Sequence, residues 1–301
     1  MQIEVTTETD ERLDAYLSEM FENISRSRFS KMIKSGDVLV NGKSEKASYK
    51  VTFGDKIEFE IKEDEKINIL PQNLSLDIVY EDENMLVVNK PSGMLTHPTI
   101  QETENTLVNA LLYYCKDNLS DLNGDFRRGI VHRLDRNTSG LLMIAKNNKT
   151  HEYLAQEIKN RNITKKYLAV VKGNIKDDFG IINQPVGRNP KNPLKMCVTD
   201  DGKPSLTEYK VLERFKECTY VELNLKTGRT HQIRVHMSYI KHPVLNDSLY
   251  GGTGLNIKTQ EQVLQSYKLE FAKPFSSDII DLQIPPDEKI VKVLGWLKSR
   301  V

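Results

Sequence analysis

The chain has 301 residues, of which 28% are charged and 38% hydrophobic, and its net charge is +1. This profile is typical of a globular protein with one large and one small domain. An apolar run of about 18 residues, which a transmembrane helix needs, does not occur, and residues 1–6 do not resemble the start of a signal peptide. The three cysteines lie far apart without a CxxC. We therefore expect a cytoplasmic protein without a disulfide framework or a bound metal.

Positive charge is distributed unevenly along the chain. Residues 24–50 hold seven lysines and arginines against two acidic residues, and residues 125–175 hold eleven against four. Two basic patches on a nearly neutral protein suit a phosphate backbone. Solvated helix faces produce similar clusters, so charge alone leaves nucleic-acid binding open.

Two short helices are predicted near the start of the chain. Apolar residues recur at helical spacing within residues 11–21. Ser25 and Gly36 are a typical N-cap and C-terminal glycine for the second helix. This second helix carries four cations, namely Arg26, Arg28, Lys31 and Lys34.

A small sheet follows these helices. Residues 38–40 form a short apolar strand, and the next residues, Asn41-Gly42, are a strong hairpin signal. A further strand with alternating apolar residues follows Gly54-Asp55. The predicted unit thus consists of two helices and a small sheet within residues 10–61.

This unit resembles the S-four type RNA-binding domain. The similarity is carried by Arg12-Leu13-Asp14, Ser25-Arg26-Ser27, Ile33-Lys34-Ser35-Gly36, Val38-Leu39-Val40-Asn41-Gly42 and Gly54-Asp55. The resemblance implies that the second helix and its following loop face RNA, and exposed cations at a helix N-terminus suit phosphate. For Arg26 and Arg28 the alternative is a surface ion pair.

Residues 62–75 are predicted to link this unit to a large domain spanning residues 76–301, because they are charged and contain a proline. The predicted strands of the large domain cover residues 76–80, 85–89, 141–145, 164–172, 206–212, 220–225, 268–272 and 279–284. The predicted helices cover residues 105–115, 149–159 and 231–240, followed by a closing helix whose apolar face holds Val291, Leu294 and Leu297. Residues 181–204, rich in proline, are expected to form an irregular excursion. Many strands with few helices favour an α+β fold around a mixed, mostly antiparallel sheet.

One stretch, residues 129–145, places a carboxylate among cations next to a buried strand. Asp135 lies two residues after Arg133, so both side chains point the same way if the segment is extended. Nearby guanidinium groups keep a carboxylate ionised, and an ionised carboxylate can act as nucleophile or base. A structural ion pair is the more common reason for such a pattern. His132 points away from Asp135 and is interpreted as structural.

Four segments in order resemble the motifs of the RluA family of pseudouridine synthases. They are Val87 to Met94 with His97-Pro98, Gly129 to Leu142, Lys166 to Gly173, and Thr227 to His236 with residues 242–251. Together with the S-four match, the resemblance covers nearly the whole chain. The combination is similar to synthases that modify large-subunit ribosomal RNA.

The resemblance implies isomerisation of uridine in RNA to pseudouridine, without cofactor or metal. Asp135 would be the essential carboxylate, which adds to the base or the sugar or removes a ribose proton. The target base must leave its stack, and Arg133 would fill the vacated space. Tyr167 would stack on the flipped base, with its hydroxyl as a possible general base.

Further basic residues receive roles from the same resemblance. Arg234 is predicted to pair with Asp135, and Arg229 is the rival for that pairing or a phosphate contact. Lys90 is assigned to RNA contact, with a loop cap as the alternative. His236, on an apolar helix face, is predicted to be a core histidine.

The sequence departs from the family pattern in two places. Lys241-His242-Pro243 and Asn246-Asp247 stand where Gly-His-Pro and Gly-Asp are usual, which affects the expected turn. Arg136-Asn137 stands where Arg or Lys followed by Asp or Glu is common, so the site has one negative charge fewer than the family pattern.

Three other functions remain as alternatives. The chain could be a catalytically silent RNA-binding or ribosome-assembly factor, or a synthase acting on transfer RNA. A glycosidase would need a second acid, and none is evident. The expected partner is RNA, most naturally ribosomal RNA, and the expected state is a monomer away from membranes.

Overall fold

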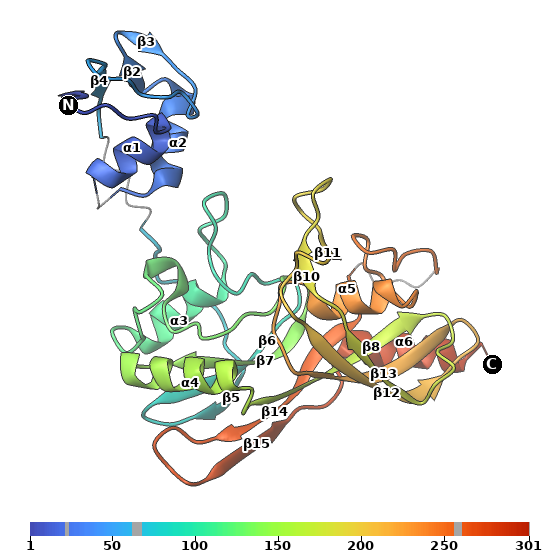
Figure 1. Cartoon of the computed structure of the whole chain (residues 1–301). Helices are drawn as coiled ribbons and strands as arrows, with labels where there is room; N and C mark the ends of the chain where they lie inside the picture. Colours follow the sequence, from blue (N-terminus) through green and yellow to red (C-terminus); the bar gives the residue numbers. More distant parts are fainter. Residues whose placement is uncertain (22–23, 62–67, 256–260, 301) are drawn as a thin grey trace. The chain divides into compact units, whose positions relative to one another are not determined.

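The computed structural model describes residues 1–21, 24–61, 68–255 and 261–300. The chain divides into two compact units, Met1–Lys66 and Ile67–Val301, each with its own hydrophobic core (Figure 1). Part of the predicted linker, residues 62–67, lies outside the described residues. Within the described ranges no helix has the length and apolar character needed to cross a membrane.

The small unit packs two helices against a four-stranded sheet. Helix α1 spans Leu13–Met20 and helix α2 spans Arg26–Ser35. The strands follow the order β1-β4-β2-β3, with β1 at Gln2–Glu4, β2 at Val38–Val40, β3 at Lys43–Ser44 and β4 at Lys56–Phe59. The sequence did not predict β1, because three residues are too few for an alternating pattern to stand out. Its place in the sheet comes from antiparallel pairing with β4.

Local residues define the ends of α2 and the hairpin after it. The Ser25 hydroxyl accepts the backbone N–H of Arg28 at 3.4 Å, and Gly36 ends the helix with a φ of 82°. Both are standard capping arrangements. Asn41 and Gly42 have φ values of 52° and 76°, as a two-residue hairpin turn requires. The predicted helix ends and hairpin are therefore confirmed.

The large unit is built on a mixed sheet that is mostly antiparallel (Figure 1). Its strand order is β5-β6-β7-β14-β8-β13-β12-β9, and β15 pairs with β14. The strands are β5 (Ile78–Glu81), β6 (Met85–Lys90), β7 (Ser139–Ala145), β8 (Thr164–Lys172), β9 (Phe179–Asn183), β12 (Leu206–Arg214), β13 (Cys218–Leu225), β14 (Leu264–Ala272) and β15 (Ile279–Gln283). Strands β7 and β14 pair in parallel, whereas the other pairs of this sheet are antiparallel. The α+β prediction is confirmed.

Helices cover both faces of the sheet near β6 and β7. The helices of the unit are α3 (Leu107–Cys115), α4 (Asn148–Asn160), α5 (Gln232–Tyr239) and α6 (Glu288–Lys298), with a 3-10 turn at Asp125–Arg127. Leu86 packs in one core with Leu111 of α3, while Met85 packs in another with Leu154 of α4. Because both faces are buried, the strand of residues 85–88 is apolar throughout rather than alternating.

Strand β13 carries the alternating pattern of a strand with one covered face. Val221 and Leu223 are fully buried and share a core with Ile233 and Met237 of α5. This packing holds α5 against the sheet and brings its first turn beside the end of β13. Residues 226–231, which connect β13 to α5, therefore form a short loop at this edge of the sheet.

The prediction of an irregular excursion over residues 181–204 is wrong. The end of β9 lies in this segment, and β10 (Val186–Arg188) pairs with β11 (Met196–Val198) in a separate two-stranded sheet. The prolines flank these short strands rather than interrupt them, which is where strands tolerate proline. The density of prolines in the segment concealed the strands.

The predicted inner face of the closing helix α6 is confirmed at two of its three residues. Leu297 is buried and Leu294 packs against the same core, whereas Val291 is 56% exposed and the core holds Ile290 and Val293 instead. The helix starts after Asp287, whose carboxylate accepts the N–H of Ile290 at 2.8 Å. With the helix starting at this cap, Ile290 rather than Val291 faces the core, so the prediction is wrong at Val291 alone.

Candidate active site

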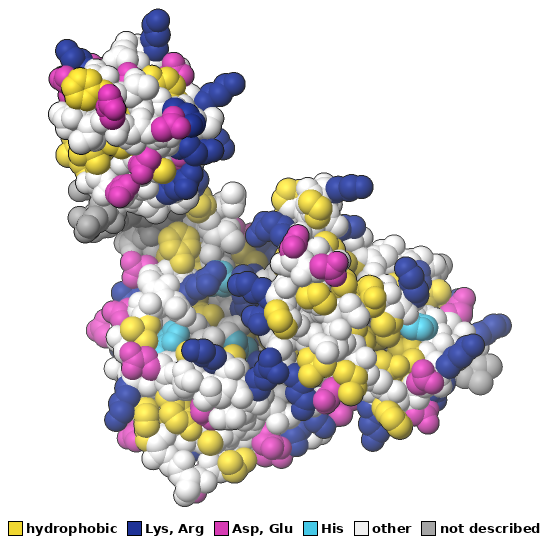
Figure 2. Space-filling view, in the orientation of Figure 1, with side chains coloured by type: hydrophobic (Ala, Val, Ile, Leu, Met, Phe, Trp, Pro, Cys, Tyr) yellow, Lys and Arg dark blue, Asp and Glu magenta, His cyan; other side chains and the backbone are white. Residues whose placement is uncertain are grey.

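A pocket of about 460 Å³ lies in the large unit, between residues 131–138, the end of α4, the start of β8 and residues 225–234. Lysine and arginine side chains surround a hollow in this face of the unit (Figure 2). The cationic residues that line the pocket are Arg133, Lys159, Arg161, Lys165, Lys226, Arg229 and Arg234. Asp135 is the one acidic residue among the described residues that line it. Such a cavity attracts anions and can hold a nucleotide.

Asp135 is bound directly by Arg234 from the first turn of α5. Arg234 Nη1 donates to Asp135 Oδ2 at 2.9 Å. Its Nε and Nη2 donate to the two oxygens of Asp247 at 2.6 and 3.0 Å. Burial lowers the pKa of Arg234, but the hydrogen bonds and charge of Asp247, together with Asp135, outweigh burial and raise the pKa overall. The guanidinium group is thus a fixed cation that orients the Asp135 carboxylate.

The loop that carries Asp135 is held from behind by the segment after β6. Thr96 Oγ1 donates to the carbonyl of Leu134 at 2.8 Å, and Ser92 Oγ donates to the carbonyl of Asn137 at 2.8 Å. Gln262 donates to Thr138 Oγ1 at 2.7 Å. These contacts come from distant parts of the chain and fix the backbone on both sides of Asp135.

Lys90 is part of this support, and its assignment to RNA contact is wrong. The side chain is fully buried, and its ammonium group donates to the carbonyls of Pro91, Met94 and Arg136 at 2.8 to 3.0 Å. Burial lowers the pKa of Lys90 to about 7, and the charge of Asp135 opposes this shift. Lys90 therefore acts as the cap of the loop, which was the alternative interpretation.

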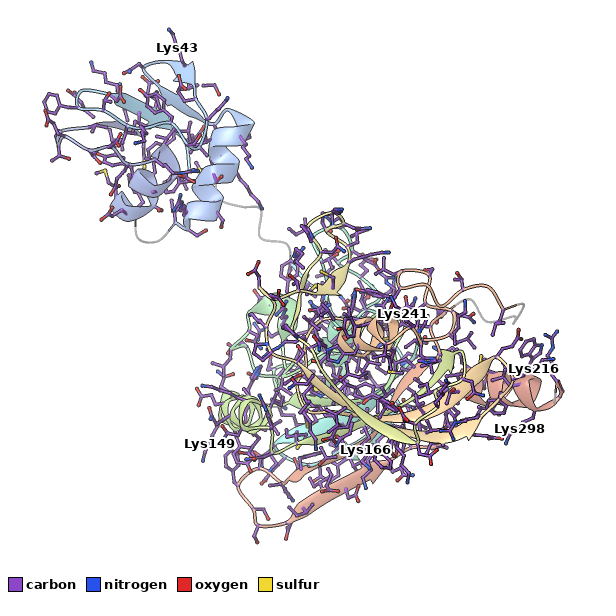
Figure 3. All side chains as sticks on the ribbon, turned by 45° about the vertical axis from the view of Figure 1, so that its right-hand side comes forward. Lys43, Lys149, Lys166, Lys216, Lys241 and Lys298 are labelled. Atoms are coloured by element: carbon purple, nitrogen blue, oxygen red, sulfur yellow. The ribbon has the colours of Figure 1, made fainter. Side chains whose placement is uncertain are left out.

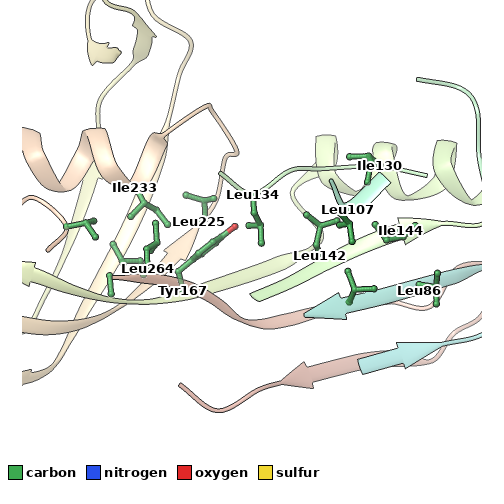
Figure 4. Packing of buried hydrophobic residues seen from close by; sticks show 14 of the residues in the cluster. Leu86, Leu107, Ile130, Leu134, Leu142, Ile144, Tyr167, Leu225, Ile233 and Leu264 are labelled. Carbon is green, nitrogen blue, oxygen red and sulfur yellow. The ribbon is translucent and has the colours of Figure 1, made fainter. Parts of the chain in front are cut away.

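Tyr167 lies on β8 at the floor of the pocket. The residue is 5% exposed and its ring packs in the apolar core, with the hydroxyl toward Leu134 and Leu225 (Figure 4). Burial raises the pKa of Tyr167 to about 12. The hydroxyl is therefore neutral at ordinary pH, which favours a packing role for the ring over a role as proton acceptor.

Comparisons with known proteins identify the family. A family model described as RNA pseudouridylate synthase matches residues 84–239, and one described as S4 domain matches residues 11–57. An uncharacterized RNA pseudouridine synthase of Bacillus subtilis is 43% identical over 301 residues, which is 99% of each chain. This chain belongs to the RNA pseudouridine synthase family.

Other relatives place the synthase in the same family. A ribosomal large subunit pseudouridine synthase D of Xanthomonas campestris is 36% identical and covers 96% of this chain and 89% of its own. The solved structure of human RNA pseudouridylate synthase domain containing 1 superposes with a TM-score of 0.59 at 28% identity. That match covers 75% of this chain and 95% of the human chain.

Arg133 and Arg229 lie at the open side of the pocket of the synthase. Both are exposed residues that line the pocket. Arg229 Nε donates to the carbonyl of Pro204 at 3.4 Å, whereas Arg234 contacts Asp135. The predicted pairing of Asp135 with Arg234 is therefore confirmed over the rival pairing with Arg229.

Sequence reasoning missed the residues that hold Arg234 in place. Asp247 is 2% exposed and also accepts the N–H groups of Leu249 and Tyr250. The Arg234 guanidinium lies 5.0 Å from the ring centroid of Tyr250. No local pattern links Asp247 to Arg234, because a turn between α5 and β14 brings them together.

His231 was also missed, although a signal for it existed. It precedes α5 in a left-handed conformation with a φ of 55°, and its Nε2 lies 3.8 Å from Asp135 Oδ2. Its Nδ1 shares a hydrogen bond of 2.8 Å with the Tyr250 hydroxyl. Burial lowers the pKa of His231 despite the charge of Asp135. In the predicted helix of residues 231–240, a spacing of three residues would put His231 and Arg234 on one face, which is the signal that could have found it.

The two histidines interpreted as structural have structural contacts. His132 Nε2 accepts the backbone N–H of Met143 at 3.0 Å. His236 is fully buried and is hydrogen-bonded to Thr207 and to the carbonyl of Gln184 at 2.9 and 3.0 Å. These two predictions are confirmed.

In the small unit, α2 presents its cations in different ways. Arg26 forms an ion pair with Asp14 at 3.2 Å and stays half exposed, as its alternative interpretation suggested. Arg28 is partly buried, and Lys31 and Lys34 are exposed. Lys31 and Lys34 are thus exposed cations of this set, and neither has an ion pair with a described residue.

Proposed function

We propose that the synthase converts specific uridines of large-subunit ribosomal RNA into pseudouridine. In this reaction the bond from N1 of uracil to C1′ of ribose breaks and the base turns. A bond then forms from C5 to C1′, C5 loses its proton to water, and N1, which kept the electron pair of the broken bond, takes up a proton. Support for a ribosomal substrate comes from the names of relatives such as the Xanthomonas enzyme and from the S-four type unit at the N-terminus.

Asp135 is the residue that we assign to the chemistry. The observation that carries this assignment is its position as the one carboxylate among the described lining residues of a cationic pocket, with Arg234 bound to it at 2.9 Å. A carboxylate held in this way can attack the base or the ribose, or remove a ribose proton. In each case Arg234 orients the oxygen that reacts, and Asp247 orients Arg234.

The target base must leave the RNA stack to reach Asp135. We assign Tyr167 to stacking on the flipped uracil, which contributes about 1–3 kcal/mol per base in comparable sites. Arg133 would occupy the space left in the RNA, since it is exposed at the rim of the pocket. Arg229 and the α2 residues Arg26, Arg28, Lys31 and Lys34 would contact phosphates.

Release of tritium from ribosomal RNA labelled at C5 of uridine tests this function. We expect release by the wild-type chain, none by Asp135→Asn, and normal release by the control Asp125→Asn, whose side chain is 71% exposed. If the wild type and Asp135→Asn both bind RNA and neither releases tritium, the chain is a silent RNA-binding factor instead. If tritium were released only from labelled transfer RNA, the substrate would be transfer RNA rather than ribosomal RNA.

Pseudouridine mapping in a deletion strain and its parent identifies the uridine. We propose that the synthase acts as a monomer in the cytoplasm, and in support of the monomer Asp135, Tyr167 and Arg234 already share one pocket within a single chain. Sedimentation of the active protein checks the monomer. A dimer at the concentration of the assay would contradict it.

A further inference from the structure

Lys165 is a cation of the pocket that none of the roles above uses. It lies on β8 two residues before Tyr167, so the two side chains are on the same face of the strand. It is 6% exposed and lines the pocket. Its neighbour Lys166 (Figure 3) points to the opposite face, where its ammonium group lies 3.1 Å from Glu222.

The two adjacent lysines differ in their partners. Lys166 has a carboxylate, whereas no described residue offers the Lys165 ammonium a carboxylate within 4 Å or a hydrogen-bond acceptor. Burial alone lowers the pKa of Lys165 to about 8. The side chain of Lys165 is largely buried, but its ammonium nitrogen is not among the fully buried unpartnered atoms of the described residues and is open to the pocket. A largely buried cation without a partner is costly. A fold that keeps one in a binding pocket is suited to an anion that arrives with the ligand.

The position of Lys165 indicates which anion this is. A Cβ atom placed on Gly228 would lie 3.9 Å from Lys165 Nζ, so the ammonium group faces the segment that also carries Lys226 and Arg229. A spacing of two residues along a strand places the Cα atoms of Lys165 and Tyr167 about 6.6 Å apart, and both residues line the pocket. One nucleotide can therefore contact both side chains.

We propose that Lys165 binds a backbone phosphate next to the target uridine while Tyr167 contacts its base. This inference rests on the proposed function, because it takes the flipped nucleotide as the occupant of the pocket. A phosphodiester supplies the negative charge that Lys165 lacks, and a lysine binds it as a point charge. Lys165 is thus a binding residue that brings the nucleotide to Asp135.

Protection from acetylation measures this contact at a single residue. The full chain is treated with an amine-acetylating reagent, alone and with a saturating short single-stranded RNA that has one central uridine, and peptides are analysed by mass spectrometry. We expect RNA to slow the modification of Lys165 at least about fivefold and to leave Lys166 unchanged. The same RNA with uncharged methylphosphonates on both sides of the uridine should protect Lys165 much less. Absence of protection, or equal protection by both RNAs, would overturn the proposal.

Variants at the two lysines provide the second test. Lys165→Met should weaken binding of this RNA about tenfold and reduce the slope of log affinity against log salt by about 0.7. Lys165→Arg should restore most of the affinity, and the matched control Lys166→Met should stay within about twofold of the wild type. An unchanged salt slope in Lys165→Met would indicate contact with the base or a structural role, and would contradict phosphate binding.

Neither measurement requires turnover. A chain that shows protection of Lys165 but releases no tritium would retain this inference and lose the proposed function. A chain that releases tritium without protecting Lys165 would retain the function and lose this inference. Thermal unfolding of Lys165→Met shows whether weaker binding results from unfolding of the variant.

Discussion

Arg234 uses three guanidinium nitrogens on two carboxylates that have different surroundings. Asp247 is buried and accepts two of the hydrogen bonds, while Asp135 accepts one and faces the pocket. The buried pair fixes the cation, and the cation orients the Asp135 carboxylate. The geometry of the carboxylate that we assign to the chemistry therefore depends on Asp247, which does not line the pocket.

Asp247→Asn should lower kcat on the order of a hundredfold, because a small displacement of a reacting group has an effect of this size. RNA affinity should stay nearly unchanged, since Asp247 does not line the pocket. Single-turnover tritium release and RNA binding separate the two quantities. The control Asp281→Asn removes a half-exposed partner of Lys268 and should have little effect. A fully active Asp247→Asn variant would contradict the orienting role.

The lowered pKa of Lys90 predicts that the stability of the protein depends on pH. Its pKa is lowered by burial from 10.5 to about 7 in the folded protein. Below pH 7 the folded and unfolded chains both carry this proton, whereas between pH 7 and 10.5 the unfolded chain binds more protons, so folding becomes more favourable as pH rises. The Tm of wild type minus that of Lys90→Met should therefore increase from pH 6.5 to 9.5.

The exposed Lys292 is the control for this measurement, because its ion pair with Glu288 lies at the surface. The Tm difference between wild type and Lys292→Met should not change over the same pH range. If the Tm difference between wild type and Lys90→Met also stayed constant with pH, Lys90 would keep an ordinary pKa in the folded protein.

Among the elements, β7 and β14 form the parallel contact that joins the two halves of the sheet. Residues 139–145 follow the loop of Asp135 directly, so this contact also fixes where the loop begins. The contact is close at Gly140, where φ is 112° and an added Cβ would lie 2.0 Å from the carbonyl oxygen of Ser266. A side chain at this position cannot be placed without separating the strands.

Gly140→Ala should lower the Tm of the large unit by about 5–10 °C, because overpacking and the positive φ act together. The control Gly295→Ala lies in α6 with no atom within 4 Å of the new methyl group. It should stabilise the protein by about 0.5–1 kcal/mol, because alanine is the better helix former. Calorimetry of both variants checks the pair, and an unchanged Tm for Gly140→Ala would contradict the close contact.

For the whole molecule, both units present cations that suit RNA. The small unit has exposed lysines on α2 and in the hairpin after it, and the large unit has cations around the pocket. Contacts to phosphate strengthen binding without selecting a sequence. Affinity and catalysis can therefore be separated by substitutions in different units.

Lys31→Ala combined with Lys34→Ala should weaken RNA binding and reduce the salt slope by about 1.4, since each phosphate that the variant no longer binds accounts for about 0.7. The rate at saturating RNA should be unchanged. Lys43→Ala, in the hairpin of the same unit (Figure 3), is the matched control and should keep the wild-type slope. If Lys43→Ala reduced the salt slope as much as the double variant at Lys31 and Lys34, α2 would have no special role in RNA binding.

Short-range interactions account for what the sequence alone determined. The caps Ser25 and Gly36, the turn at Asn41 and the apolar run of residues 141–145 each depend on neighbours within a few positions, so their patterns can be read locally. The roles of Asp135 and Tyr167 were predicted from the family resemblance instead. The same resemblance, and no local pattern, predicted the pairing of Arg234 with Asp135 across 99 residues of the chain.

Tertiary structure decided the contacts between distant segments. The pairing of β1 with β4, the burial of Lys90 behind the loop and the bond from Asp247 to Arg234 join residues with no shared local pattern. Whether a lysine meets water, carbonyl groups or a binding pocket depends on which strands and helices pack around it. Packing thus made Lys90 a support of the Asp135 loop and left Lys165 facing the pocket.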